Sequence, residues 1–115
     1  MIAVPEFRGR VSPTFDFCHR VTLWRVDGRG ARKVGTRRCR ATSNRERLAE
    51  LLAAGVEVLL CGAVAPESAV ELRAHGIEVV MGVSGPVATV VAAFVCGALD
   101  RPQFRLPGYE LAASR

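Results

Sequence analysis

One sequence pattern occurs twice, 21 residues apart, and this repeat constrains the fold more than any other feature. The two copies are Gly55-Val-Glu-Val-Leu and Gly76-Ile-Glu-Val-Val. Each copy is typical of a strand, and each is followed by a loop and a helix with a proline near its start, Pro66 or Pro86. Because strands that alternate with helices pair in parallel through right-handed crossovers, the repeat predicts an α/β domain.

The N-terminal half of the chain adds three strands and a helix. Residues 2–4 are short and apolar and end at a proline, as expected of a buried strand. Residues 20–26 are rich in β formers, and the turn residues at 27–30 send the chain back along 31–39, which predicts a hairpin. Residues 43–46 match a capping box and start a helix. We therefore expect a five-stranded mixed sheet with helices on both faces. Numbered along the chain, its strands take the order 3-2-1-4-5, with the second strand antiparallel.

The length and composition suit a single domain over residues 1–115, because half of the residues are hydrophobic. Its ordered core is expected at about residues 1–99, with a tail at 100–115. The first residues lack the basic and apolar regions of a secretory signal, which favours a cytoplasmic location. Residues 76–99 carry one charge and are long enough to cross a bilayer, but two glycines and a proline interrupt them. We expect a buried strand followed by a buried helix there, and no membrane span.

The basic charge is concentrated in the first half of the chain. Residues 1–47 hold eleven Arg and one Lys against four acids, whereas residues 48–115 hold four Arg against seven acids. Such a segment can suit nucleic acid or an anionic ligand, and it can also be a solvated edge that discourages aggregation of the hairpin. The hairpin has one Trp and no aromatic ladder on which bases could stack, so we expect no binding to nucleic acid.

The predicted topology locates a candidate binding site. In open α/β sheets, ligands bind beyond the carboxyl ends of parallel strands, where the connections diverge. Here this crevice lies between the first and fourth strands, where the loop at 5–13 meets the turns at 61–63 and 82–85. The loop offers cations and a hydroxyl, the turns offer backbone amides at helix N-termini, and one thiol offers a soft metal ligand. The candidate residues are Arg8, Arg10, Ser12, Cys61, Gly62, Ser84 and Gly85.

The remaining thiols and imidazoles offer fewer candidates. The four cysteines contain no Cys-x-x-Cys pair and are expected to be reduced. Cys18 and His19 are a second candidate for metal ligation, although neighbours on an extended chain point to opposite faces. Cys39 and Cys96 are most simply packing residues. His75 precedes a helix-ending glycine, where the helix dipole favours it.

The sequence offers little support for catalysis. A two-metal nuclease needs clustered carboxylates, whereas only Asp16 is expected near the crevice. Nucleophilic catalysis needs a base beside a cysteine or serine, and the chain has just two histidines. The glycine turn at 82–85 lacks the lysine of a P-loop, so nucleoside triphosphate hydrolysis has no support either. We therefore expect a binding protein and not an enzyme.

Five motifs occur in order along the chain and carry a family resemblance. They are Gly9-Arg10-Val11-Ser12-Pro13 with Phe15-Asp16, Val58-Leu59-Leu60-Cys61-Gly62-Ala63, Gly82-Val83-Ser84-Gly85, Gly97-Ala98-Leu99 and Phe104-Arg105-Leu106-Pro107-Gly108. As a set, over Met1 to about Gly108, they resemble the dinitrogenase iron-molybdenum cofactor biosynthesis family. The resemblance implies a three-layer α/β/α domain of ribonuclease H-like fold, and a carrier of the iron-molybdenum cofactor or its iron-sulfur precursors. Thr14 and Tyr109 stand where many cofactor-binding relatives have histidine and cysteine, so the chain is closer to the small stand-alone members.

Two hypotheses follow. The first is a non-enzymatic carrier of an iron-sulfur or iron-molybdenum cluster that is accessory to metallocofactor assembly. The family resemblance implies that this assembly serves nitrogen fixation. Cys61, Cys18 and His19 would be its metal ligands, and assembly or recipient proteins its partners. It would be a monomer or homodimer without contact to nucleic acid or membrane. The alternative is a regulatory or interaction module that has kept the fold and lost the cluster.

Overall fold

The computed structural model describes residues 1–40 and 43–106. Its strands are β1 (Ile2–Phe7), β2 (Arg10–Val11), β3 (Arg20–Asp27), β4 (Gly30–Arg38), β5 (Val58–Leu60) and β6 (Glu78–Val80). Its helices are α1 (Asn44–Ala53), α2 (Pro66–Ala74) and α3 (Val87–Val95), followed by a short 3-10 helix, η1 (Pro102–Phe104). The end of the predicted tail, with Tyr109, lies outside the described residues.

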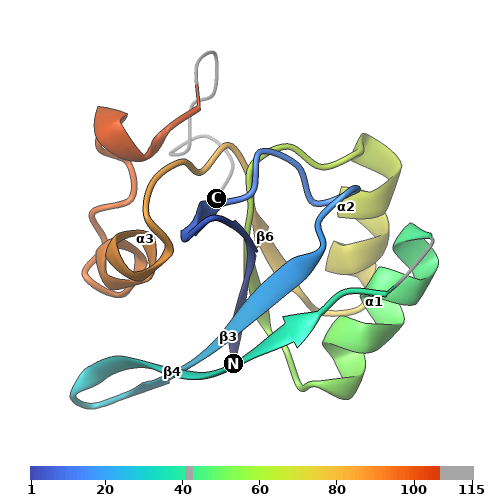
Figure 1. The fold of residues 1–115 in the computed structure, drawn as a ribbon, viewed down its shortest axis with the longest axis horizontal. Coiled ribbons are helices and arrows are strands. Elements are labelled where there is room, and N and C mark those ends of the chain that lie inside the picture. Colours follow the sequence, from blue (N-terminus) through green and yellow to red (C-terminus); the bar gives the residue numbers. More distant parts are fainter. Residues whose placement is uncertain (41–42, 107–115) are drawn as a thin grey trace.

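The strands form one mixed sheet in the order β4-β3-β1-β5-β6, with β2 paired to β1 (Figure 1). β1 is antiparallel to β3 and parallel to β5, and β5 is parallel to β6. The hairpin, the helix after it and the two strand–helix repeats form where the sequence predicts them. The sheet has six strands in the described part of the chain, however, where the sequence predicts five.

The extra strand arises because β1 is longer than predicted. β1 continues through Pro5 to Phe7, and the chain then turns back as β2, within the segment expected to be a loop. The pairing of β1 with β5 covers only Ile2 and Ala3. The Pro5 carbonyl accepts a hydrogen bond from the Ser12 amide at 2.7 Å, on the side where β5 has ended. The missing proline N–H therefore costs no ladder hydrogen bond there.

Helices cover both faces of the sheet (Figure 1). Side chains on one face of the sheet pack against α3. The members of this cluster that belong to the sheet include Ile2, Val4, Leu60 and Val80. Side chains on the other face pack against α1 and α2, and their sheet members include Ala3, Leu23, Leu59 and Val79. This alternation along each strand divides the core into two layers, as the two-residue period of a strand requires.

Residues 76–99 form β6 and α3, as the sequence predicts. No helix in the described ranges is long and apolar enough to span a membrane. The helix after the hairpin begins with the expected cap, because Ser43 Oγ accepts a hydrogen bond from the Glu46 amide at 3.2 Å. Gly55 follows this helix with a φ of +76°, a left-handed conformation that glycine adopts without strain.

Candidate functional site

The three segments predicted to form the crevice do meet. The Phe15 amide donates to the Ala63 carbonyl at 2.8 Å, and the Ala63 amide donates to the Pro13 carbonyl at 2.8 Å. The Val11 amide donates to the Gly85 carbonyl at 2.9 Å. These direct backbone contacts leave the loop packed against both turns, so the predicted crevice is filled by the chain itself.

Five amides of the turns and helix N-termini predicted to bind an anion already donate within the chain. In the turn at 82–85, Gly82 donates to the Gly62 carbonyl, Val83 to the Cys61 carbonyl and Ser84 to the Phe104 carbonyl, at 2.8 to 3.0 Å. At the start of α2, the Ala65 amide donates to the Asp16 carboxylate at 3.0 Å. At the start of α3, the Val87 amide donates to the Gly9 carbonyl at 3.0 Å. These five amides are unavailable to a ligand in this conformation.

Three predicted site residues have structural roles. Ser12 is buried, and its hydroxyl donates to the Thr14 carbonyl at 3.0 Å. Gly62 lies so close to the loop that a Cβ atom would be 2.4 Å from the Pro13 carbonyl oxygen. Gly85 has a φ of +133°, which other residues rarely adopt. Together they let the loop pack tightly on the turns.

Cys61 is brought to the predicted place, but its thiol is completely buried. Its Sγ donates to the Val80 carbonyl, 3.7 Å away. Burial, and secondarily the nearby Asp16 carboxylate, raises the pKa of this thiol to about 12. Because the thiolate is the form that ligates metal, Cys61 offers no ligand in this conformation.

Cys18 and His19 point to opposite sides of the chain. Cys18 is buried in the core beside α1, whereas His19 is exposed. Burial, and secondarily the neighbouring Cys39, raises the pKa of the Cys18 thiol to about 12, against an opposing effect of Arg47. The two residues therefore do not converge on one ion. Within residues 1–40 and 43–106, no three His, Cys, Asp or Glu side chains gather as a metal site.

A surface pocket of about 290 Å³ lies where β1 ends and β3 begins. We call it the β1–β3 pocket, and its lining residues are Glu6, Phe7, Arg8, His19 and Arg20. The Arg8 guanidinium lies over the Phe7 ring, 5.2 Å from its centroid. Glu6 accepts a hydrogen bond from the Gly9 amide at 3.0 Å, which holds the turn that carries Arg8.

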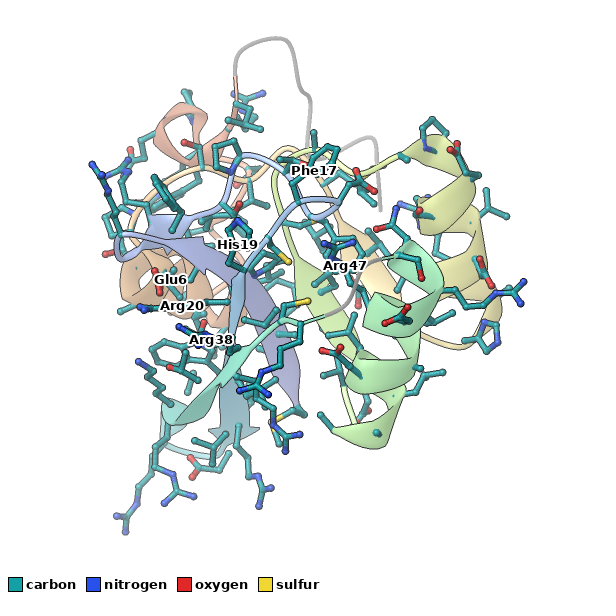
Figure 2. All side chains as sticks on the ribbon, turned by 45° about the vertical axis from the view of Figure 1, so that its right-hand side comes forward. Glu6, Phe17, His19, Arg20, Arg38 and Arg47 are labelled. Carbon is teal, nitrogen blue, oxygen red and sulfur yellow. The ribbon has the colours of Figure 1, made fainter. Side chains whose placement is uncertain are left out.

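The strand register brings a further cation to this pocket. Arg20 on β3 lies opposite Glu6 on β1 and opposite Arg38 on β4, so the three residues form one row across the sheet. Figure 2 shows this row with His19 beside it. Arg10 is exposed on β2 and lies outside the pocket lining. The pocket therefore combines guanidinium groups, one imidazole and one carboxylate.

Glu6, Phe7 and Arg20 were missed in the sequence because their grouping depends on the register of β1 with β3. If β1 is ended at Pro5, Glu6 belongs to a loop and has no cross-strand partner. No alternating pattern marks the longer strand, because residues 2–5 are all apolar and all buried.

Comparisons with known proteins identify similar chains. The family model described as "Dinitrogenase iron-molybdenum cofactor" matches residues 1–97. No protein of curated function matches the sequence. The crystal structure of PH0822 is similar with a TM-score of 0.75 and 22% identity, over 84% of this chain and 90% of that one. A Methanocaldococcus jannaschii protein, mj0327, proposed to be a dinitrogenase, is similar with a TM-score of 0.66 and 15% identity, over 84% and 88% of the two chains. At these identities the two structures show a shared fold.

Proposed function

The chain belongs to the dinitrogenase iron-molybdenum cofactor family, and on this basis we propose that it binds an anionic metal–sulfur cluster in the β1–β3 pocket. The cluster is of the iron-sulfur or iron-molybdenum type. The protein acts as a non-enzymatic carrier in the cytoplasm, between metallocofactor assembly proteins and recipient proteins. Its three layers around a central β1 support assigning it to the ribonuclease H-like folds.

The observation that carries the proposal is the grouping of positive charge around one pocket. Arg8 and Arg20 line the pocket, and Arg38 lies directly opposite Arg20. Like charges in directly opposed cross-strand positions destabilise a sheet unless an opposite charge balances them. Glu6 supplies one negative charge, and a bound anion would supply more. Guanidinium groups are suited to this because they stay charged at any physiological pH.

His19 is the metal ligand in this proposal. It lines the pocket, it is exposed, and imidazole is a ligand that iron accepts. Cys61 and Cys18, the other ligands expected from the sequence, are buried as protonated thiols. Thr14, at the position where relatives have histidine, accepts a hydrogen bond from the Asp16 amide at 3.1 Å. A cluster held by charge and one imidazole would be released readily, as a carrier requires.

The test removes two arginines from the pocket. Protein purified without oxygen is reconstituted with ferrous iron and sulfide, and bound iron and sulfide per chain are measured. We expect the Arg8→Ala/Arg20→Ala double variant to retain several-fold less of both than the parent. The matched control is Arg25→Ala/Arg32→Ala, which removes an exposed cross-strand arginine pair from the same hairpin outside the pocket. Equal losses in the two double variants would refute the pocket assignment.

A specific observation also favours the second candidate, an interaction module without a cluster. Phe7 and Phe17 are 55% and 76% exposed, and the Arg8 guanidinium lies over the Phe7 ring. Exposed aromatic rings suit a protein partner. For this candidate, reconstituted parent protein would stay colourless, and the two double variants would be indistinguishable from it in iron content.

A further inference from the structure

We propose that Cys18 and Cys39 form a reversible disulfide when the protein meets a peroxide. The two side chains belong to one core cluster, in which Cys18 is buried and Cys39 packs against it, although 21 residues separate them in the chain. Cys39 lies near enough to Cys18 to help raise the pKa of its thiol. All four cysteines are free in this structure, which therefore shows the pair in its reduced state. This inference needs no bound cluster and therefore stands apart from the proposed function.

The fold brings the two thiols together at the end of the hairpin. The Cys39 amide donates to the His19 carbonyl at 2.7 Å, which extends the β3–β4 pairing one residue beyond Arg20 and Arg38. His19 is exposed here, and Cys18 is the residue that turns into the core on the α1 side. Cys39 packs against the same core cluster, so both sulfur atoms lie on one side of the hairpin.

The surroundings of the pair allow a small oxidant to reach it. Cys39 is partly exposed and lines a cavity of about 20 Å³, with Phe15 and Arg47 among its other walls. A cavity of this size holds about one water-sized molecule. Figure 2 shows Arg47 on α1 lying toward the start of β3, and its positive charge lowers the pKa of the Cys18 thiol against the larger effect of burial. Its Nε is buried and has no hydrogen-bond partner among the described residues.

The chemistry balances with hydrogen peroxide as the oxidant. The Cys39 sulfur attacks one peroxide oxygen, the O–O bond breaks, and Cys39 sulfenic acid and one water form. The Cys18 sulfur then attacks the Cys39 sulfur, the S–O bond breaks, and the hydroxyl leaves with the thiol proton as a second water. Two thiols lose two electrons in total, and peroxide is reduced to two waters. A dithiol reductant reverses the bond by thiol–disulfide exchange.

Peptide mapping of the parent protein is the direct test. Reduced protein is treated with hydrogen peroxide, blocked with iodoacetamide, and digested with trypsin without a reductant. We expect residues 11–20 and residues 39–40 as one linked pair, because arginines flank both segments. The count of free thiols should fall from four to two, and dithiothreitol should restore it.

Variants separate the pair from the other thiols. Cys96→Ser removes the exposed cysteine and should leave the linked peptide and the loss of two thiols unchanged. Cys39→Ser, at a partly exposed position, should abolish the link and leave Cys18 reduced. A linked pair that contains Cys96, or Cys39 recovered only as a sulfinic acid in the parent, would overturn the proposal. So would a parent protein that keeps all four thiols.

Discussion

At the scale of single residues, Gly62 decides how closely the loop after β1 approaches β5. A Cβ atom at this position would lie 2.4 Å from the Pro13 carbonyl oxygen and 2.7 Å from that of Ser12. Both neighbours are backbone atoms, so they cannot turn aside as a flexible side chain can. The loop would have to move away from the strand end, and its hydrogen bonds to Ala63 would lengthen.

We therefore predict that Gly62→Ala lowers the free energy of unfolding by about 1–3 kcal/mol, as overpacking does in other proteins. Urea denaturation measures the change. Gly28→Ala is the control, since a Cβ atom there meets nothing within 4 Å, and its effect should stay below about 0.5 kcal/mol. Equal stability of the two variants would show that the loop is not packed as described.

The buried Cys61 thiol should make the stability of the folded protein decrease at alkaline pH. Its pKa is raised from 9.0 to about 12 in the folded state, so the unfolded chain loses this proton first as the pH rises. The stabilisation is complete below about pH 9 and is lost progressively between about pH 9 and 12, by roughly 1 kcal/mol per pH unit. Urea midpoints of the parent should therefore fall more steeply between pH 8 and 10.5 than those of Cys61→Ala. Parallel pH profiles would contradict the burial of this thiol.

At the scale of elements, Asp16 joins the loop to two helices. Its carboxylate accepts the Ala65 amide at the start of α2, where no side chain of the helix itself provides a cap. It also accepts a hydrogen bond from the Asn44 side chain at the start of α1, which in turn donates to Ser68 Oγ at 2.7 Å. The one acid that the sequence places near the crevice is therefore a cap, and not a metal ligand.

Loss of this cap should be measurable. We predict that Asp16→Ala lowers the free energy of unfolding by about 1–2 kcal/mol, the usual range for a lost helix cap with an additional hydrogen bond. Asp100→Ala, at an exposed position, is the control and should change it by less than about 0.5 kcal/mol. Thermal or urea unfolding compares the two. A neutral Asp16→Ala would mean that water replaces the carboxylate at no cost.

The sequence predicts elements well where local signals and topology agree. The repeat that starts at Gly55 and Gly76 yields two parallel strands, and the hairpin yields two antiparallel ones. The predicted end of β1 was wrong, because a proline such as Pro5 normally stops a strand. Pro5 is tolerated inside β1 because the pairing with β5 has already ended before it. This error also hid the candidate site from the sequence analysis, because the β1–β3 pocket exists only if β1 continues to Phe7.

At the scale of the whole molecule, topology predicted which segments meet but not what fills the space between them. The loop, the turn after β5 and the turn after β6 converge as expected. Whether their amides face a ligand or another carbonyl depends on the loop conformation, for which the sequence contains no local signal. Cys61 lies at the predicted strand end, yet strand alternation turns its side chain into the core.

The basic half of the molecule offers a further prediction. If the hairpin arginines bind phosphates, affinity for generic DNA or RNA should fall with salt, with a log–log slope of about −0.7 to −0.9 per contact. We expect no such binding at physiological salt, because Trp24 is partly buried and the hairpin presents no row of aromatic rings. Sub-micromolar binding with a steep salt slope would contradict this.

The central claim is that a cluster is held in the β1–β3 pocket by His19 and not at the end of β5 by Cys61. The most direct measurement is bound iron and sulfide per chain after anaerobic reconstitution of His19→Ala and Cys61→Ala, with folding checked by circular dichroism. We predict that Cys61→Ala binds as much iron and sulfide per chain as the parent, whereas His19→Ala binds several-fold less. Parental loading in His19→Ala, with loss in a folded Cys61→Ala, would contradict it.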